Sequence, residues 1–323
     1  MDVSVIVVSW NTKGLLCDCL QSILEQAGDV DYEIVVVDNA SSDGSAEMVR
    51  SHFPNVTLIV EQTNRGYAAA INDGIRVAQG RYVLILNSDT LVCDAAIAKT
   101  VGYADKHPEA AVVGCQVRES LDKVQMTCFR FPSLLNLLLR VSGLARCFKK
   151  NCFFGRGDMR WWQRDSEQEV DTVSGMFMLV RREAIDEVGL MDTAYFLYCE
   201  ETDWCYRFAK AGWKMLFWPG AVIIHLGGGG HSSKSQELRL KVQMQKSILL
   251  FFKKHHGVIQ YLLARLILTV YTGLLYLASE LVLMGKSVVA RDVINDRNEC
   301  KIRWCVFKYC ILGIEPERVN EES

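Results

Sequence analysis

An acidic cluster stands out in the stretch FLYCEETDWCYRFAKAGW, which covers residues 196–213. Glu200, Glu201 and Asp203 crowd into four positions between bulky apolar residues. Carboxylates that lie close together in apolar surroundings have raised pKa values, so one of them becomes a better general base at neutral pH. The alternative is an acidic helix N-terminus without a catalytic role, and for Asp203 stabilisation of the helix dipole remains open.

Other polar residues follow four predicted strands, at the point where each strand ends. They are Ser9-Trp10-Asn11, residues 38–44, residues 62–66 and residues 87–90. Ligands of open parallel sheets bind beyond the carboxyl ends of the strands. Such residues also form turns and cap helices, which alone explains Ser41, Ser42 and Gly44. Asp38 and Asp89 come directly at strand ends, where a carboxylate would line the binding crevice.

The elements that position these residues alternate along the chain. Short runs rich in β-branched residues, such as VSVIVVS and YEIVVVD, are followed by segments with helical spacing of apolar residues. Strands that are apolar on both faces and alternate with helices predict a mostly parallel sheet covered on both sides. Residues 117–170 lose this rhythm and carry basic and aromatic residues, which we interpret as a variable insertion over the cleft.

Composition narrows the class of protein. The 323 residues carry 36 Lys and Arg against 38 Asp and Glu, so nothing indicates a nucleic-acid partner. The 12 cysteines include no C-x-x-C pair, and Met1-Asp2 leads directly into a strand-like run rather than a secretory signal. These features predict reduced thiols and a cytoplasmic location.

A long apolar segment follows the α/β region. Residues 258–285 are apolar apart from Gln260, Arg265 and Glu280, and the uncharged interval between the two charged residues is shorter than a bilayer span requires. Lys253, Lys254, His255 and His256 precede the segment, and Lys286 and Arg291 follow it. An interfacial helix or hairpin is the favoured interpretation, while a membrane span and a soluble oligomer interface remain open.

Several of these stretches together resemble the motifs of family 2 glycosyltransferases, and most closely the rhamnosyltransferase-like branch that builds bacterial surface polysaccharides. The motifs are VSVIVVSWN, VVVDNASSDGS, TNRGYAAAINDGI, LILNSDT, the stretch from Gly175 to Trp213, and AVIIH. The resemblance covers roughly residues 1–255, with the motifs in the family's order. It implies a GT-A fold and an inverting transfer from a nucleotide sugar, helped by Mg²⁺ or Mn²⁺.

The resemblance also implies residue roles. The nucleotide-sugar-binding residues would be Ser9, Trp10, Asn11, Asp38, Asn39, Arg65, Gly66, Asn87 and Ser88. A carboxylate at Asp38 can accept the N3–H of uracil or thymine, which favours a UDP or dTDP donor. Arg65 would approach the diphosphate, with a surface ion pair as the alternative.

The same resemblance implies the metal-binding residues and the general base. Asp89 matches the second Asp of the family's DxD element, and Asn87 replaces the first. His225, at the end of AVIIH, resembles a late metal-ligating His, with a buried structural His as the alternative. Glu201 is the expected general base and Glu200 the second candidate, although the family usually has Asp at the position of Glu201.

These expectations give a domain plan and a function. Residues 1–257 would form the catalytic domain, residues 258–290 a membrane-associated apolar helical segment, and residues 291–323 a charged tail. The enzyme would transfer one sugar, rhamnose by preference, to a lipid-linked or polysaccharide acceptor at the inner face of the plasma membrane. The alternative function is an inactive nucleotide-sugar-binding scaffold. The donated sugar, the linkage and the oligomeric state stay open.

Overall fold

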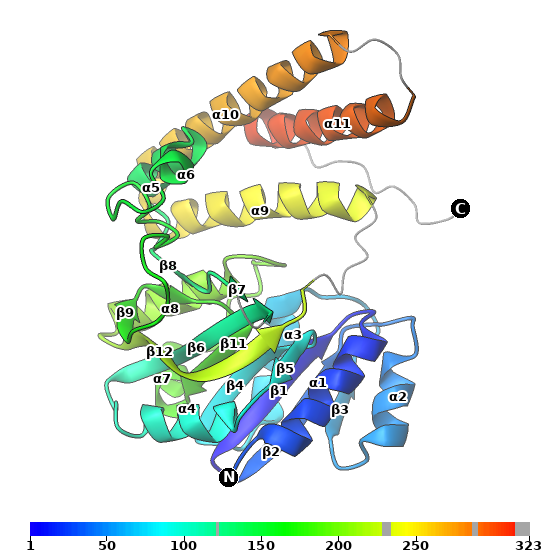
Figure 1. Cartoon of the computed structure of the whole chain (residues 1–323), viewed down its shortest axis with the longest axis vertical. Helices are drawn as coiled ribbons and strands as arrows, with labels where there is room; N and C mark the ends of the chain where they lie inside the picture. The colour runs from blue at the N-terminus through cyan, green and yellow to red at the C-terminus, as the bar shows by residue number, and fades with distance from the viewer. Residues whose placement is uncertain (121–122, 228–233, 286–289, 314–323) are drawn as a thin grey trace. The chain divides into compact units, whose positions relative to one another are not determined.

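The chain forms two compact units in a computed structural model that describes residues 1–120, 123–227, 234–285 and 290–313. Unit 1 comprises Met1–Phe131 and Phe148–Gly230, and unit 2 comprises Pro132–Cys147 and His231–Ser323. Unit 1 is a helix-flanked sheet and unit 2 is helical (Figure 1).

Unit 1 is built on one large sheet whose strands run in the order β3-β2-β1-β4-β11-β6-β12-β5, with β7 paired to β6 and β9 paired to β12. The pairs β1–β2, β1–β4, β2–β3 and β6–β12 are parallel. The strands are β1 (Val3–Ser9), β2 (Tyr32–Asp38), β3 (Thr57–Val60), β4 (Tyr82–Asn87), β5 (Thr90–Val92), β6 (Ala110–Ser120), β7 (Lys123–Val124), β9 (Gln168–Val170), β11 (Phe177–Arg181) and β12 (Lys214–His225). The predicted mostly parallel sheet is confirmed.

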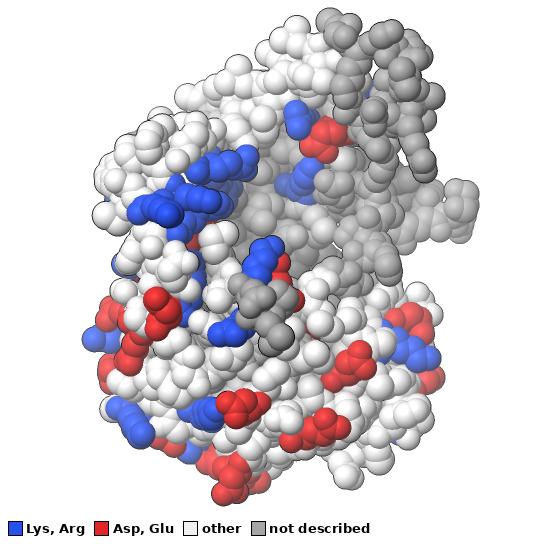
Figure 2. Space-filling model, viewed as in Figure 1, with Lys and Arg blue, Asp and Glu red and all other residues white. Residues whose placement is uncertain are grey.

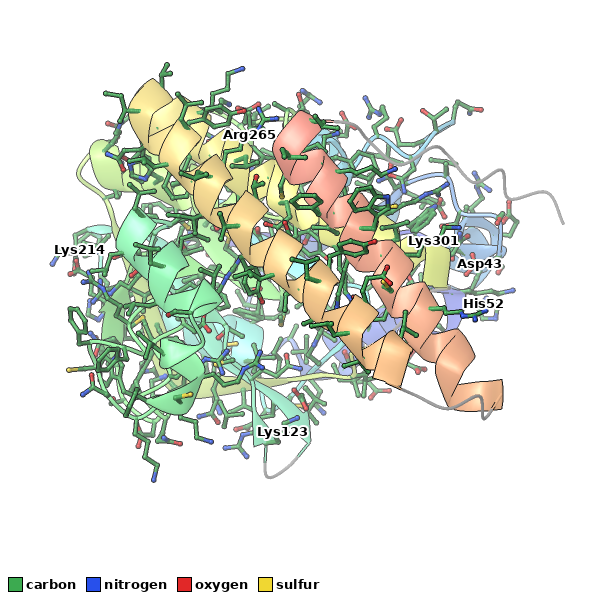
Figure 3. The ribbon with its side chains drawn as sticks, turned by 90° about the horizontal axis from the view of Figure 1, so that it is seen from above. Asp43, His52, Lys123, Lys214, Arg265 and Lys301 are labelled. Carbon is green, nitrogen blue, oxygen red and sulfur yellow. The ribbon has the colours of Figure 1, made fainter. Side chains whose placement is uncertain are left out.

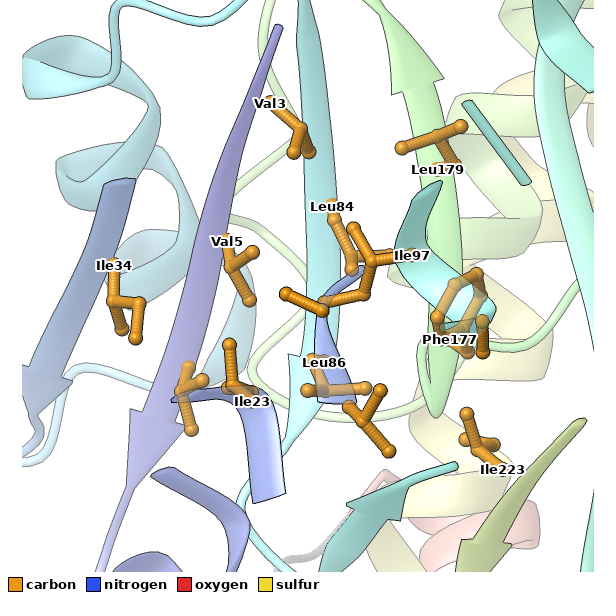
Figure 4. Close-up of a cluster of buried hydrophobic side chains, with 14 of the residues drawn as sticks. Val3, Val5, Ile23, Ile34, Leu84, Leu86, Ile97, Phe177, Leu179 and Ile223 are labelled. Carbon is orange, nitrogen blue, oxygen red and sulfur yellow. The ribbon is translucent and has the colours of Figure 1, made fainter. Parts of the chain in front are cut away.

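Helices cover both faces of this sheet because its strands alternate apolar side chains between two cores. Val3, Val5 and Val7 of β1 belong to one core and Ile6 and Val8 to the other. The helices of the first core, part of which Figure 4 shows, are α1 (Lys13–Gln26), α2 (Ser45–His52) and α4 (Ala96–Ala104). Those of the second are α3 (Tyr67–Val77), α7 (Arg182–Val188) and α8 (Glu200–Lys210).

Three details of the sheet differ from the simple alternation. Strand β11 is antiparallel to both of its neighbours, β4 and β6. The runs KMLFW and AVIIH form one strand, β12, whose register shifts between Trp218 and Val222. Strand β5 is a short addition directly after Asp89, paired with the end of β12. A buried antiparallel strand has the same apolar pattern as a parallel one, so periodicity does not separate the two.

The segment 117–170 is shared between the units. In unit 1 it contains β8 (Cys128–Phe129), which pairs with β10 (Thr172–Val173). The buried Arg164 guanidinium donates hydrogen bonds to the carbonyl oxygens of Met159, Trp162, Cys128 and Asp158 and so ties this part together. Its helices α5 (Leu134–Val141) and α6 (Leu144–Cys147) belong to unit 2. That the insertion covers the cleft stays a prediction.

The main helices of unit 2 are α9 (Lys234–His255), α10 (Gly257–Gly285) and α11 (Ala290–Leu312). Helix α9 buries Val242, Ile248, Leu249, Phe251 and Phe252. Glu299 of α11 accepts hydrogen bonds from Lys241 of α9 at 3.3 Å and from Arg303 at 3.2 Å. Sequence reasoning grouped residues up to 257 with the catalytic domain, whereas α9 packs with α10 and α11 in unit 2.

One helix among the described residues, Gly257–Leu283, is long and apolar enough to cross a membrane by length and composition. Only 17% of its most apolar window is buried. The C-terminal apolar helix predicted from the sequence is therefore present, and few of its side chains are buried.

Candidate active site

The predicted binding residues converge at the carboxyl ends of the parallel strands. Ser9 is the register partner of Asp38 on β2, and Val8 is the partner of Asn87 on β4. The direction of strand succession reverses between β1 and β4, because β2 and β3 lie on one side of β1 and β4 on the other. Such a reversal opens a crevice beyond the strand ends, where ligands of open α/β sheets bind.

Asp38 is a buried carboxylate whose two oxygens differ in their hydrogen bonding. Its side chain is 1% exposed, and Oδ1 accepts a 2.7 Å hydrogen bond from the backbone N–H of Ser41. Within the described part of the chain, the buried Oδ2 has no hydrogen-bond partner. A buried polar atom without a partner is costly, so this oxygen is a site where a ligand donor would be stabilising.

The side chain of Asn39, by contrast, forms its hydrogen bonds within the protein. Its amide nitrogen donates to Asn64 Oδ1 at 3.1 Å and to the carbonyl oxygen of Gly66 at 3.3 Å, and its Oδ1 accepts from the backbone N–H of Arg65 at 3.1 Å. Asn39 therefore fixes the loop after β3, and its contact with a nucleotide sugar stays a prediction.

A chain of hydroxyl groups connects the segments that follow β1 and β4. Ser9 Oγ lies 3.0 Å from Thr12 Oγ1, which lies 3.0 Å from Ser88 Oγ. Thr12 was not among the predicted site residues. Asn11, with a left-handed φ of 55°, accepts a 2.8 Å hydrogen bond from the backbone N–H of Ser42, and Trp10 is 43% exposed.

Gly66 allows a close approach between the loop after β3 and the acidic stretch. Its φ is +87°, and an added Cβ would lie 2.5 Å from the carbonyl oxygen of Phe196. The same carbonyl accepts a 2.8 Å hydrogen bond from the backbone N–H of Tyr67. Only glycine satisfies both the left-handed backbone and this contact.

Arg65 forms ion pairs on the protein surface. Its guanidinium contacts Glu61 at 2.8 Å and also Asp73, and its side chain is 44% exposed. These partners agree with the surface ion pair that the sequence left open. A role for Arg65 at the diphosphate stays a prediction.

Asp89 and His225 meet where β5 pairs with the end of β12. His225 Nε2 lies 3.1 Å from Asp89 Oδ1, and the two side chains are 12% and 17% exposed respectively. The contact is fixed by pairing of Thr90 with His225 between β5 and β12. His225 Nδ1 is buried and has no hydrogen-bond partner among the described residues. Within the described ranges, no group of three or more His, Cys, Asp or Glu side chains could hold a metal ion. Asp89 and His225 are therefore a pair of candidate ligands rather than a larger cluster.

Glu200 and Glu201 open helix α8 after two residues with left-handed backbone, Tyr198 and Cys199. Glu200 is 2% exposed, and its Oε2 finds no hydrogen-bond partner in the residues that the structure describes. Glu201 is half-buried, and its Oε1 accepts a 3.1 Å hydrogen bond from the backbone N–H of Gly175. Glu201 is therefore the more accessible carboxylate of the pair.

Burial raises the pKa of both glutamates. The pKa of Glu200 lies well above the usual value, first because of burial and then because of the charge of Glu201. The pKa of Glu201 is also raised by burial, although backbone N–H groups, including that of Gly175, oppose the shift. Asp203, in contrast, pairs with Arg207 at 2.9 Å and stabilises the first turns of the helix.

Tyr67 links the acidic pair to the loop after β4. Its hydroxyl donates a 3.1 Å hydrogen bond to Asn87 Oδ1 and lies 3.5 Å from the carbonyl oxygen of Gly175, whose N–H holds Glu201. Burial, followed by the charges of Glu201, Glu200 and Asp89, raises the pKa of Tyr67 well above its usual value. The hydroxyl therefore stays protonated and acts as a donor.

Replacement of Tyr67 tests this link. Tyr67→Phe is expected to lower kcat about tenfold, the effect of one lost buried hydrogen bond, while the Kd for nucleotide stays unchanged. Tyr82→Phe is the control, because Tyr82, at the start of β4, is a buried tyrosine whose hydroxyl donates to Asp105 instead. Equal losses of kcat in both variants would assign Tyr67 a structural role only.

Most of the predicted residues thus gather at one sheet edge, around the carboxyl ends of β1, β2 and β4, with Glu200 and Glu201 reached through Tyr67 and Gly175. Arg65 is engaged in ion pairs, and Asn39 is engaged in the loop. Sequence reasoning missed Thr12, Tyr67 and Gly175. Tyr67 directly follows the T-N-R-G run, which is the one signal that could have drawn attention to it.

Comparison with known proteins gives three findings. A model of glycosyl transferase family 2 matches residues 4–189. An N-acetylglucosaminyl-diphospho-decaprenol L-rhamnosyltransferase of Mycobacterium tuberculosis is 26% identical over 250 residues, which covers 72% of this chain and 78% of the relative. The rhamnosyltransferase WbbL of Escherichia coli is 25% identical over 232 residues and covers 69% and 83% of the two chains.

A solved structure is similar over nearly the whole chain. It is the mannosyltransferase PcManGT from Pyrobaculum calidifontis, in complex with GDP-Man and Mn²⁺. The TM-score is 0.57 at 19% sequence identity, and the match covers 97% of this chain and 88% of the other. At this identity the similarity supports the GT-A-like fold, with the mixed, mostly parallel sheet described above.

Proposed function

Since the chain belongs to glycosyl transferase family 2, whose model matches residues 4–189, and acts as a nucleotide-sugar-dependent glycosyltransferase, we propose the reaction that it performs. The enzyme moves one sugar, rhamnose by preference, from a dTDP- or UDP-sugar to a lipid-linked or polysaccharide acceptor, with inversion at the anomeric carbon. The two rhamnosyltransferase relatives support the sugar. The mycobacterial relative is named for a decaprenol-linked substrate, which supports a lipid-linked acceptor.

One observation carries the choice of nucleotide: the Oδ2 atom of Asp38, which is buried and lacks a partner among the described residues. Uracil and thymine present an N3–H donor beside two carbonyl oxygens, whereas cytosine has no N3–H. A carboxylate oxygen at the end of β2 complements that donor. Charge-assisted hydrogen bonds of this kind are among the stronger ones in proteins.

Substitution of Asp38 tests the nucleotide assignment. Asp38→Ala is expected to weaken binding of UDP and dTDP by roughly 10- to 100-fold, the value of a hydrogen bond to a charged group. Binding would be measured by calorimetry, with Asp18→Ala on the exposed side of α1 as the control. Unchanged affinity for both nucleotides would remove Asp38 from the base-binding site.

Asp89 and His225 are the residues that would hold a divalent cation. A carboxylate and an imidazole lie at the same edge, 3.1 Å apart, and the second nitrogen of His225 has no partner in the described chain. A carboxylate and imidazole pair that leaves positions for diphosphate oxygens fits Mg²⁺ or Mn²⁺. Bound there, the cation would neutralise the charge that develops on the leaving diphosphate. The Mn²⁺ in the complex of the similar mannosyltransferase supports this choice.

Glu201 is the general base in this proposal. As the acceptor hydroxyl oxygen forms its bond to the anomeric carbon, the bond from that carbon to the diphosphate breaks, and the hydroxyl proton passes to Glu201. Attack opposite the leaving group inverts the anomeric configuration. The N–H of Gly175 orients the Glu201 carboxylate, and the Tyr67 hydroxyl donates to Asn87 and lies 3.5 Å from the carbonyl oxygen of Gly175. Glu200 is buried next to Glu201 in the chain, and the charge of Glu201 contributes to the raised pKa of Glu200.

The raised pKa of Glu200 predicts a dependence of stability on pH. A carboxyl whose folded-state pKa is raised stabilises the fold below its unfolded pKa, and this contribution is lost as the pH rises through the folded value. Gln resembles the protonated acid at every pH. Glu200→Gln is therefore expected to raise Tm by about 2–4 °C at mildly alkaline pH, a gain of about 1 kcal/mol, and to have little effect near pH 4.

Thermal unfolding over a range of pH checks this expectation. Glu183→Gln, at an exposed position of α7, is the control and should leave Tm unchanged at every pH. If Glu200→Gln lowered Tm at alkaline pH, Glu200 would be ionised and favourably paired in the folded protein, and the coupling to Glu201 would be wrong.

The place of reaction is the cytoplasmic surface of the plasma membrane, where a lipid-linked acceptor would be presented. The outward-facing apolar residues of α10 support this location. The proposed enzyme acts as a peripheral protein with a nucleotide-sugar donor and a lipid-linked glycan as its partners.

A further inference from the structure

Helix α10 carries a continuous apolar stripe that the protein leaves exposed. The stripe residues are Val258, Ile259, Leu262, Leu263, Leu266, Val270, Leu274, Leu277, Leu281 and Val282. They recur at intervals of three or four, so they occupy one side of the helix along almost its whole length. Ile259, Leu266 and Leu281 are 76%, 59% and 69% exposed. Ordinary soluble surfaces rarely expose a contiguous apolar area of this extent.

The opposite side of α10 is packed within unit 2. Its buried residues are Ala264, Leu268, Thr272 and Ser279, which follow helical spacing on the side away from the stripe. Gly273 lies so close to Phe307 of α11 that an added Cβ would be 3.0 Å from its ring. Figures 1 and 3 show α10 and α11 lying side by side.

The two charged residues of α10 take part in this packing. Arg265, labelled in Figure 3, donates hydrogen bonds to the carbonyl oxygens of Cys310 at 2.8 Å and Ile311 at 3.2 Å, at the end of α11. Glu280 accepts from Cys300 Sγ at 3.1 Å, and Arg303 donates to the carbonyl oxygen of Leu275 at 3.2 Å. Polar contacts therefore connect α10 to α11 at both ends of the apolar segment.

This arrangement disfavours a membrane span. The uncharged residues 266–279 between Arg265 and Glu280 rise about 21 Å as a helix, whereas a hydrocarbon core is about 30 Å thick. A spanning α10 would bring at least one of these charges into lipid. A spanning α10 would also either draw α11, with its charged Glu299, Arg303 and Lys308, into the bilayer or lose its contacts with α11.

Cations accompany the stripe in unit 2. Helix α5 packs against α10, and the exposed Arg140 and Arg146 lie on α5 and α6. Lys and Arg side chains gather over these two helices in Figure 2. The sequence has no Asp or Glu from residue 123 to residue 157. Apolar residues beside cations complement a membrane surface with anionic headgroups.

We propose that α10 lies in the plane of an anionic phospholipid surface, with its apolar stripe in the headgroup boundary, α11 on the side away from the lipid, and Arg140 and Arg146 in contact with headgroups. The inference extends the proposed membrane location to a defined orientation and lipid class. It does not depend on donor or acceptor, so its failure would leave the proposed reaction untouched.

Flotation of the purified full chain with vesicles tests the proposal. Vesicles of phosphatidylcholine with phosphatidylglycerol should bind the protein more tightly than phosphatidylcholine alone. Leu266→Asn combined with Leu274→Asn should reduce binding to both at least tenfold. The control is Leu24→Asn combined with Val60→Asn, which changes two exposed apolar residues of unit 1 and should have no effect. Retained binding by the Leu266 and Leu274 variant would overturn the assignment of the stripe.

The charge requirement has its own variants. Arg140→Gln with Arg146→Gln should weaken binding to the anionic vesicles by roughly fivefold for each charge removed, with no change on phosphatidylcholine. Arg50→Gln with Arg76→Gln, at exposed positions of unit 1, is the control. Equal loss in both pairs would show that net charge, rather than α5 and α6, determines the preference.

Alkaline carbonate extraction of membranes from cells that express the chain separates the two orientations. An in-plane helix predicts release into the supernatant. Retention in the pellet would mean that α10 spans the bilayer and would overturn the proposal. Absence of vesicle binding, with a dimer that the Leu266 and Leu274 variant dissociates, would assign the stripe to a second copy and overturn it as well.

Discussion

Glu201→Gln is expected to reduce sugar transfer by roughly 10²- to 10⁴-fold, the usual contribution of a general base, while nucleotide binding stays near normal. The amide keeps the size of the side chain but cannot take a proton from the acceptor. The hydrogen bond from Gly175 to the Oε1 position can remain, so the loop should keep its conformation. Steady-state turnover and calorimetric Kd values measured on the same preparation check both halves of the expectation.

Two further variants make this result specific. Glu200→Gln should lower turnover less than Glu201→Gln, because Glu200 is buried and the more accessible Glu201 is the proposed base. Glu183→Gln on α7 should leave turnover unchanged. Near-normal turnover in Glu201→Gln, with a large loss in Glu200→Gln, would transfer the role of base to Glu200.

The pH dependence of kcat/KM provides a second view of the same pair. The pKa values of both glutamates are raised, so activity should fall on acidification at a pH above the usual titration range of a glutamate. The apparent pKa values belong to the coupled pair rather than to one residue.

Asp89→Ala should lower the affinity for nucleoside diphosphate in the presence of Mn²⁺ by at least roughly 100-fold, and turnover should fall with it. The substitution removes one of the two protein groups that meet at this edge and leaves His225 without its carboxylate partner. Without Mn²⁺, the variant and the wild type should bind nucleotide equally weakly, because the proposed role of Asp89 is to hold the cation.

The control for Asp89 lies close by in the sequence. Asp94 is 86% exposed and pairs with Lys99, so Asp94→Ala removes a carboxylate from the same region without changing the pair. It should leave both Mn²⁺-dependent affinity and turnover unchanged. Mn²⁺-dependent binding that survived in Asp89→Ala would place the cation elsewhere.

The sequence predicted correctly that several candidate site residues lie at the ends of strands. Asp38, Asn87 and Asp89 follow strands whose apolar runs are unambiguous, so their meeting at one sheet edge follows from the parallel arrangement. The roles of these residues remain predictions, because positions alone do not show what they bind.

Contacts between distant segments could not be predicted in the same way. The approach of Gly66 to Phe196 and the contact of Tyr67 with Gly175, whose N–H in turn holds Glu201, join segments more than 100 positions apart. No local periodicity carries such information. The antiparallel direction of β11 could not be predicted either, because burial on both faces produces the same apolar pattern in parallel and antiparallel strands.

The C-terminal region shows a different limit. Hydropathy identified residues 258–285 but could not separate a span from an interfacial helix, because both are apolar over a similar length. The proposed in-plane orientation is argued from α11, whose polar contacts with Arg265 and Glu280 became visible only in three dimensions.

Calorimetric titration of the wild-type chain with dTDP, UDP and GDP, each with and without Mn²⁺, tests the central claim most directly. The account predicts binding of dTDP or UDP that requires Mn²⁺, because the free oxygen at Asp38 complements the N3–H of thymine and uracil. Binding of none of the three, or a clear preference for GDP, would contradict it.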